Sequence, residues 1–340
     1  TGDVFDGSIS GNETKIKDLP GQAKKSIELN DILFSEIRPK NKRFALVTGI
    51  DPKNYVVSTK LMVLRNKNNL VLDTNYLYFY LTSPLMLAYF QSEAESRSGT
   101  FPQITFRENV ANIKIDLPPL IEQRKIVQRL SVVNDKVKLN NQINDNLIAI
   151  SKAKWLDLLS STSTTEVSMN KIAKITMGQS PKSSTYNTNN EGLPLLNGAT
   201  DFRENINPQR WTSDPKRVVY PNSYIFGVRA TIGLTTKVYQ KYAIGRGTGA
   251  ATPINIIYDE FLYFYLEDLF KFYSQTGSGS VYINISKKEF ENYKIDVPKI
   301  SFIEQFHSEI NPLFNQIKNN KLQNITLLQI KNDMLNKYFQ

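Results

Sequence analysis

The sequence predicts an α/β protein with two pseudo-symmetric mixed α/β domains joined by a long antiparallel two-helix coiled coil. Three observations support this prediction. The length of 340 residues fits about two domains, the chain repeats itself with a period of about 180 residues, and two long segments carry a heptad pattern. We expect domains at residues 1–117 and 161–299, with the helices at 118–160 and 300–340.

The repeat consists of three pairs of matching segments that keep one order and nearly one spacing. YLYFYL at 76–81 matches FLYFYL at 261–266, NIKIDLP at 112–118 matches NYKIDVP at 292–298, and IEQ at 121–123 matches IEQ at 303–305. A period this long exceeds that of solenoid repeats. It indicates a tandem duplication of a domain followed by a helix.

The two long helices are predicted from apolar residues that recur every seven positions. One row runs through Ile126, Val133 and Leu147, and the other through Ile303, Ile310 and Ile317. Pro312 lies inside the second pattern, so we expect it to kink that helix or to start it afresh. If a two-fold axis relates the two units, the helices run antiparallel.

Both heptad seams contain asparagines midway, and two interpretations remain open. The residues are Asn140, Asn144, Asn320 and Asn324. A buried asparagine fixes the register of paired helices at some cost in stability. Alternatively, these asparagines face solvent on marginal helices.

The segments between the helices mix strand and helix patterns. Runs rich in β-branched and aromatic residues predict strands at Val56–Leu64, Tyr224–Ile232 and Ala250–Tyr258. Asn75–Phe90 and Glu260–Tyr273 are predicted to be helices whose aromatic residues belong to the core.

Composition excludes most catalytic chemistry. The chain has no cysteine and one histidine, His307, so zinc clusters, thiol nucleophiles and disulfides are excluded. The Gly-Lys of a phosphate-binding loop is absent, as are the catalytic tetrapeptide of amino-methyltransferases and the common nuclease motif. GRGTGA at 245–250 leads into a strand pattern, whereas a dinucleotide site requires a helix there. We therefore expect neither a catalytic nor a metal site, and the lack of a long apolar run predicts a cytoplasmic protein without a membrane segment.

The remaining candidates are mainly cationic side chains in loops rich in Gly, Ser and Asn. The net charge of +10, with 42 Lys and Arg against 32 Asp and Glu, is spread along the chain. Arginine can grip a guanine edge with two hydrogen bonds, and Lys or Ser can hold phosphate oxygens. The predicted DNA contacts are Arg38, Lys40, Lys42, Arg43 and Arg97 in the first domain, and Lys216, Arg229, Arg246 and Ser278 in the second.

With these residues in view, the chain resembles the specificity subunit of type I restriction–modification systems. The resemblance covers nearly the whole chain and is most specific at PLIEQRKIVQRL (119–130), with FGVRATIG (226–233) and DILFSEIRPK (31–40) also matching. It implies that each domain is a target-recognition domain reading half of a split double-stranded DNA sequence. It also implies that the coiled coil spaces the halves and docks two modification subunits, which bind S-adenosylmethionine and methylate adenine.

On this resemblance, the chain itself is non-catalytic and holds no cofactor. We expect the helix starts to contact the modification subunits through Glu122, Gln123, Glu304 and Gln305. Whether restriction or translocase subunits also join remains open. The sequence leaves two other classes open as alternatives, a stand-alone catalytic protein such as a nuclease and a coiled-coil scaffold that binds no DNA.

The first domain departs from the second in one respect. Phe34 matches Phe226, yet Phe34 has only 33 residues before it, whereas Phe226 comes 65 residues after residue 161. The first domain thus has no counterpart of VSMNKIAKITMGQSP (167–181). We expect this recognition domain to be N-terminally incomplete.

Overall fold

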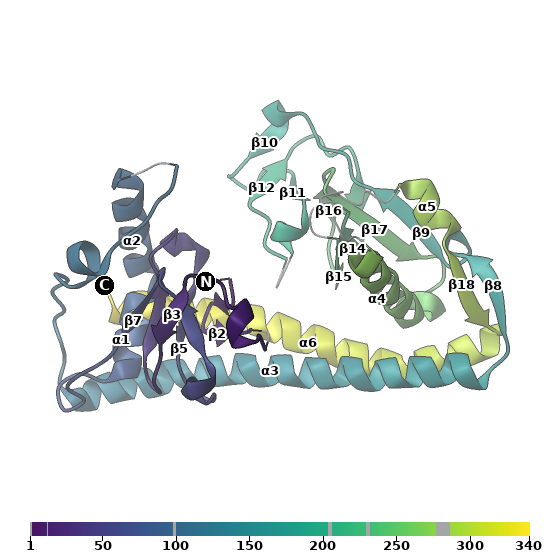
Figure 1. Cartoon of the computed structure of the whole chain (residues 1–340). Coiled ribbons are helices and arrows are strands. Elements are labelled where there is room, and N and C mark those ends of the chain that lie inside the picture. The colour runs from purple at the N-terminus through teal and green to yellow at the C-terminus, as the bar shows by residue number, and fades with distance from the viewer. Residues whose placement is uncertain (1, 12, 98–99, 203–205, 229–231, 277–285) are drawn as a thin grey trace. The chain divides into compact units, whose positions relative to one another are not determined.

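The computed structural model describes residues 2–11, 13–97, 100–202, 206–228, 232–276 and 286–340 (Figure 1). The chain divides into two compact units. Unit 1 contains residues 1–141 and 320–340, and unit 2 contains residues 142–319. Each long helix therefore contributes one part to each unit.

Unit 1 combines short antiparallel strands with two helices. The strands are β1 (Val4–Phe5), β2 (Ser8–Ile9), β3 (Ala23–Ser26), β4 (Ile32–Ser35), β5 (Phe44–Leu46), β6 (Val56–Ser58) and β7 (Leu61–Leu64). The helices are α1 (Thr74–Leu81), α2 (Pro84–Arg97), the first part of α3 (Leu120–Ser161) and the last part of α6 (Ile300–Tyr338). The main sheet has the order β5-β4-β7, while β3 pairs with β6 and β1 with β2.

Unit 2 contains two larger sheets and a strand pair. Its strands are β8 (Thr164–Ser168), β9 (Ala173–Met177), β10 (Tyr186–Asn187), β11 (Leu193–Leu196), β12 (Arg210–Thr212), β13 (Val218–Val219), β14 (Tyr224–Gly227), β15 (Gly233–Lys237), β16 (Tyr242–Ile244), β17 (Thr248–Pro253) and β18 (Lys294–Pro298). Its helices are the last part of α3, α4 (Asp259–Thr276), α5 (Lys287–Asn292) and the first part of α6. The sheets have the orders β15-β14-β17-β9 and β10-β12-β11-β16-β13, and β18 pairs with β8.

The duplication is visible in the strand register. Phe34 of β4 lies opposite Met62 of β7, and its match Phe226 of β14 lies opposite Gly249 of β17. By the same register, β7 corresponds to β17, with Leu61 at the position of Thr248. The two domains thus share a central antiparallel arrangement.

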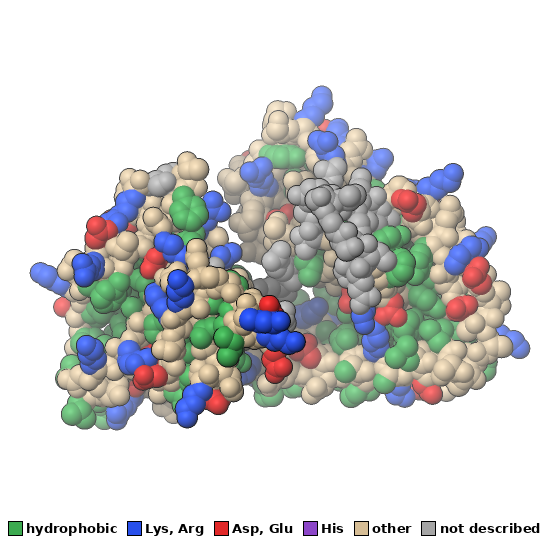
Figure 2. Space-filling model, in the orientation of Figure 1, with side chains coloured by type: hydrophobic (Ala, Val, Ile, Leu, Met, Phe, Trp, Pro, Cys, Tyr) green, Lys and Arg blue, Asp and Glu red, His purple; other side chains and the backbone are tan. Residues whose placement is uncertain are grey.

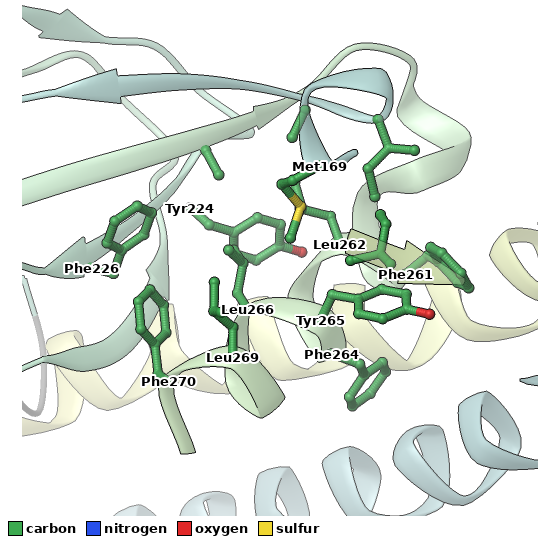
Figure 3. Packing of buried hydrophobic residues seen from close by; sticks show 14 of the residues in the cluster. Met169, Tyr224, Phe226, Phe261, Leu262, Phe264, Tyr265, Leu266, Leu269 and Phe270 are labelled. Atoms are coloured by element: carbon green, nitrogen blue, oxygen red, sulfur yellow. The ribbon is translucent and has the colours of Figure 1, made fainter. Parts of the chain in front are cut away.

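Each unit buries the repeated aromatic helix against a long helix. In unit 2, Phe261 and Phe264 of α4 pack with Trp155 of α3 and Ile303 of α6 in one cluster, part of which Figure 3 shows. In unit 1, Tyr76 and Phe79 of α1 pack with residues of α3 and α6, including Leu130, Leu335 and Phe339. Burying one such apolar side chain contributes about 1.5–3 kcal/mol. The aromatic repeat is therefore core in both units, as predicted.

The two long helices pack antiparallel in both units. In unit 1, Leu130 of α3 shares its cluster with Leu335 of α6. In unit 2, the Nζ atom of Lys154 lies 2.7 Å from Oε2 of Glu309. Within unit 1, Arg129 meets Tyr338 and Asn140 meets Asn324, so residue numbers rise along α3 as those of the facing α6 residues fall, which confirms the predicted antiparallel pair.

The seam asparagines are buried, so the solvent-facing alternative is wrong. Asn140 is 0% exposed and Asn324 is 4% exposed. The Asn140 amide donates to Oδ1 of Asn324 at 2.8 Å and to Oε1 of Gln323 at 2.8 Å. The Asn324 amide donates to Oδ1 of Asn141 at 2.8 Å. Asn144 and Asn320 are also buried.

Two of the predicted elements are divided in the structure. Val56–Leu64 forms β6 and β7, which belong to different sheets. Asn75–Phe90 covers α1 from its second residue and the first half of α2, because Pro84 has no N–H to continue α1 and instead begins α2.

Three further elements differ in their extent. Of Tyr224–Ile232, β14 covers only Tyr224–Gly227, and residues 229–231 lie outside the described part. Of Ala250–Tyr258, β17 ends at Pro253 and a 3₁₀ turn follows. Helix α6 continues through Pro312 without starting afresh.

Candidate nucleic-acid interface

The loop between β4 and β5 presents basic residues on an unusual backbone. Arg38 has φ of 46° and Lys42 has φ of 52°, both in the left-handed region that non-glycine residues rarely adopt. The Arg38 N–H donates to the Pro102 carbonyl at 3.0 Å, and the Lys40 N–H donates to Oε1 of Gln91 at 3.0 Å. These contacts fix the loop, and the side chains of Arg38, Lys40 and Lys42 are exposed.

Several predicted cations of unit 1 already have partners. The Nζ atom of Lys42 lies 3.4 Å from Oδ2 of Asp6. Arg97 pairs with Glu108, and this pair lowers the pKa of that carboxyl. Exposed ion pairs such as these contribute about 0–1 kcal/mol, so a phosphate can compete for the cation. Arg43 is half-buried and takes part in interactions within the chain.

In unit 2, Arg246 stands on a loop that requires glycine. A Cβ at Gly245 would lie 2.0 Å from Oδ1 of Asn197, and one at Gly247 would lie 2.4 Å from the Asn197 carbonyl oxygen. The Gly245 N–H donates to Leu196 and the Gly247 N–H to Asn197. The close approach of Asn197 therefore explains Gly245 and Gly247 of GRGTGA, which leads into β17 as expected. The Arg246 side chain is exposed on this fixed loop.

A pocket of about 400 Å³ lies next to this loop. Its lining residues are mainly polar and include Tyr186, Asn197, Thr200, Asp201, Gln209 and Arg210. The Arg210 guanidinium lies 5.9 Å from the centre of the Tyr186 ring.

Asp201 is turned toward the backbone rather than left free for a ligand. It accepts hydrogen bonds from the N–H groups of Asn197 at 2.7 Å and Gly198 at 3.3 Å. Its pKa is raised by burial, against the effect of these hydrogen bonds and of Arg210. The rest of the pocket thus offers Asn, Gln, Thr and Arg, the side-chain types that read base edges.

The pocket residues were missed from the sequence because base contacts were predicted in other loops, rich in Gly, Ser and Asn. Gln209 precedes and Arg210 begins strand β12, within the segment NPQRW. Successive side chains of a strand point to opposite faces of the sheet, so every second one can face a ligand. An exposed Arg beside an aromatic residue in a short strand was the available signal.

The other predicted contacts of unit 2 are less informative. Lys216 is exposed and its Nζ lies 2.6 Å from Oδ2 of Asp214. Arg229 and Ser278 lie outside the described residues. On the face seen in Figure 2, Lys and Arg side chains are scattered among acidic ones and do not form a single patch.

The four residues predicted to meet partner subunits have different environments. Glu122 is exposed and pairs with Lys125 at 2.7 Å, Glu304 is exposed, and Gln305 donates to Glu309 at 3.3 Å. Gln123 is 0% exposed. It accepts from the Asp73 N–H at 2.8 Å and donates to the Val71 and Pro118 carbonyls, each at 2.9 Å. Gln123 therefore ties the start of α3 to the segment before α1.

The histidine belongs to a buried polar network in unit 2. Nδ1 of His307 lies 2.6 Å from Oε2 of Glu260, and the Asn311 amide donates to Oε1 of Glu260 at 2.8 Å. Burial raises the pKa of Glu260, and the hydrogen bond with His307 opposes this. Next to it, Lys237 pairs with the buried carboxylate of Asp259. The network joins α6 to α4 and β15.

Metal sites and membrane-spanning helices are the other classes of feature to be considered. Over the residues that the structure describes, no three His, Asp or Glu side chains are grouped so that they could hold a metal ion. Within the same residues, no helix combines the length and apolar character needed to cross a membrane.

Comparison with known proteins identifies the family. A family model described as "Type I restriction modification DNA specificity domain" matches residues 3–148 and 163–327. The chain belongs to this family. Membership confirms the resemblance to specificity subunits, and with it the assignment of the chain to a non-catalytic class.

Two specificity subunits and one solved structure illustrate the similarity. The type I restriction enzyme HindI specificity subunit of Haemophilus influenzae is 47% identical over 154 residues, 45% of this chain and 33% of that protein. A protein of Methanocaldococcus jannaschii named as a putative MjaX specificity subunit is 28% identical over 82% of this chain and 70% of its own length. The alignment thus spans about a third of the HindI subunit and somewhat over two thirds of the MjaX protein.

The solved structure supports the fold of the specificity family. The type I restriction–modification S subunit from M. genitalium aligns with a TM-score of 0.51 at 15% identity, covering 93% of this chain and 84% of that one. Two mixed α/β domains with two long packed helices are therefore the fold of this family member, as predicted.

Proposed function

We propose that this chain reads a bipartite double-stranded DNA target, one half with each unit, and positions two adenine-methylating modification subunits on it. The family match supports a role in DNA specificity. The observation that carries the two-part reading is the duplicated antiparallel strand pair, β4 with β7 and β14 with β17, which holds Phe34 and Phe226 in the same register. In each unit a fixed backbone next to that strand pair presents an exposed arginine, Arg38 in one and Arg246 in the other.

In this proposal the arginines and the pocket residues read bases, while the paired lysines hold phosphates. A bidentate contact of Arg with guanine discriminates by about 1–3 kcal/mol against the wrong base. Gln209 and Asn197 can each form a pair of hydrogen bonds with adenine. Lys42 and Lys216 sit in exposed ion pairs that a phosphate can replace, and such contacts carry no sequence information.

The partner contacts are proposed at the exposed helix starts. Glu122, Glu304 and Gln305 present polar groups there, whereas the buried Gln123 positions the helix that carries Glu122. S-adenosylmethionine is assigned to the modification subunits. The complex would act in the cytoplasm, with restriction subunits as a further possible component.

The experiment compares two matched pairs of variants, Arg38→Ala with Lys42→Ala and Arg246→Ala with Lys216→Ala. Each is co-expressed with the modification subunits, and methylated adenines are mapped across the host genome. Each arginine variant should relax the methylated sequence at one half-site only. Each lysine variant should leave the methylated sequence unchanged. It should reduce the slope of the logarithm of the binding constant against the logarithm of the salt concentration by about one.

Three outcomes would contradict the proposal. Equal effects of all four changes on specific and random DNA would show that the base readers are assigned wrongly. If the purified complex binds the mapped target sequences no better than random DNA, the scaffold class remains as the explanation. Cleavage of DNA by the chain alone would place it in the catalytic class.

A further inference from the structure

A segment that follows α2 runs beside the loop that carries Arg38. An isolated antiparallel bridge pairs Ile37 with Gln103. Next to this bridge, the Arg38 N–H donates to the Pro102 carbonyl at 3.0 Å. These backbone contacts hold the segment and the loop against each other.

The guanidinium of Arg38 is held at the same place. Its Nη2 atom lies 3.5 Å from the carbonyl oxygen of Thr100, to which it donates. A guanidinium carries five N–H donors, so this contact leaves the donors that a guanine edge would need. The tip of the Arg38 side chain therefore lies beside the backbone of Phe101, the residue that follows Thr100.

Phe101 presents an aromatic ring on this fixed backbone. It is 47% exposed, whereas Ile104 is 0% exposed and Pro102 is also buried. The buried neighbours anchor the segment and leave the ring of Phe101 partly in solvent. A single exposed phenylalanine is common on protein surfaces. This one adjoins an exposed arginine whose backbone is in the left-handed region, a conformation that clusters at functional sites.

The second repeat has an aromatic residue at the matching position of its sequence. TFPQIT at 100–105 aligns with VYINIS at 281–286 when Thr105 is matched with Ser286, since each of these is the N-cap of the following helix. Phe101 then matches Tyr282. Residues 281–285 lie outside the described part of the chain. An aromatic side chain at this position is thus common to both repeats.

The ring suits a contact that an arginine cannot make. In the major groove, thymine carries a C5-methyl group, and apolar side chains such as Phe recognise it. One residue of extended chain spans about 3.3 Å, close to the spacing of about 3.4 Å between successive base pairs. The side chain of Phe101, one residue from the carbonyl that meets the Arg38 guanidinium, can therefore reach the neighbouring base pair.

We propose that Phe101 contacts the C5-methyl group of a thymine in the base pair next to the guanine that Arg38 reads. This inference rests on the proposed function, in which the Arg38 loop reads bases. It adds an apolar specificity contact to the arginine contact. The half-site of unit 1 should therefore contain a G·C pair beside an A·T pair, and uracil should be a poorer ligand than thymine there.

The test uses the chain in complex with its modification subunits and the target found by methylation mapping. Arg38→Ala identifies the G·C pair, because the methylated sequence should relax at that position. At the neighbouring thymine, deoxyuridine removes only the methyl group and keeps the base-pairing hydrogen bonds. By fluorescence anisotropy, the parent complex should bind the deoxyuridine duplex about fourfold more weakly, the factor that corresponds to burying one methyl group. The Phe101→Ala complex should bind the two duplexes equally.

Phe106→Ala is the matched control. Phe106 is 50% exposed and lies on the short helix that follows the segment. Its variant should keep the fourfold ratio between the two duplexes. Because the ratio compares two duplexes for one protein, a partial loss of folded protein cancels from it.

Several results would overturn the inference and leave the proposed function intact. These are a target without an A·T pair beside that G·C pair, equal binding of both duplexes by the parent complex, and a fourfold ratio that Phe101→Ala keeps or Phe106→Ala loses. Uniform weakening of all DNA by Phe101→Ala, without a thymine preference in the parent, would instead make the ring a wedge between base steps. If the parent complex prefers no sequence at all, the proposed function fails and the thymine contact fails with it.

Discussion

The buried amide layer between α3 and α6 allows a quantitative test. Replacing Asn140 by Leu removes the donor to Oδ1 of Asn324, a residue that is only 4% exposed. Replacing Asn324 by Leu leaves the Asn140 amide, on a residue 0% exposed, with Gln323 alone. An unpaired buried polar group costs about 1–3 kcal/mol. The Asn140→Leu change should therefore destabilise the pair by about that amount, and Asn324→Leu by less, because the Asn140 amide keeps Gln323 as a partner.

The double change should behave differently from the sum of the two. With both amides gone, the two introduced leucine side chains can pack together, and replacing both partners by apolar groups is close to neutral. The difference between the double variant and the sum of the singles should therefore be at least about 1 kcal/mol in favour of the double variant.

The assay is native-state hydrogen exchange at amides of α3 and α6 around these positions. It reports local opening and does not require the two units to unfold together. Asn336→Leu, an exposed position on α6, is the matched control and should change the opening free energy by less than about 0.5 kcal/mol. If the double variant loses as much as the two single variants together, the argument from unpaired amides is refuted.

Three further predictions concern spacing, pH and the glycine loop. Four residues inserted after Asn141, with a matched insertion in α6, lengthen the helices by about 6 Å. The mapped methylation sites should then show at most about two more base pairs between unchanged half-sites. An unchanged gap with full activity would exclude the helices as the spacer. Because the pKa of Glu260 is raised, its carboxyl group keeps its proton to higher pH in the folded chain than in the unfolded chain. Stability therefore falls as pH rises from the ordinary pKa of a glutamate through the pKa of Glu260 in the folded chain. The Tm of the Glu260→Gln variant should therefore rise relative to the parent Tm as pH increases over that range. A difference between the two Tm values that stays constant with pH would contradict this sign. Gly247→Ala should displace the loop from Asn197 and weaken binding at one half-site as much as Arg246→Ala does, whereas normal binding by this variant would show that the loop tolerates a Cβ.

The duplication and the helices could be predicted because they depend on periodicity. Heptads fix which side chains of α3 and α6 face each other, and the observed α3 (Leu120–Ser161) and α6 (Ile300–Tyr338) lie within two residues of the expected bounds. The antiparallel sense followed from the repeat. These features rest on local pattern and symmetry, which one sequence contains.

The polar contacts could not be predicted because they depend on segments far apart in the chain. Gln123 was expected at a partner surface, but its amide meets the segment before α1, about 50 residues away. The pocket near Arg246 joins residues from β10, β11 and β12 whose strand order no local pattern specifies. Burial of the seam asparagines likewise depends on where the partner helix lies, which no local pattern specifies.

The discontinuity of unit 1 has a consequence for synthesis on the ribosome. Its core contains Leu335 and Phe339, which are translated about 200 residues after the rest of the unit, whereas unit 2 is continuous in the chain. Domains ordinarily fold in the order in which they emerge. Here the unit that emerges first can complete its core only after the final helix has been made. Loss of the last few residues should therefore damage the amino-terminal unit and leave the neighbouring unit folded.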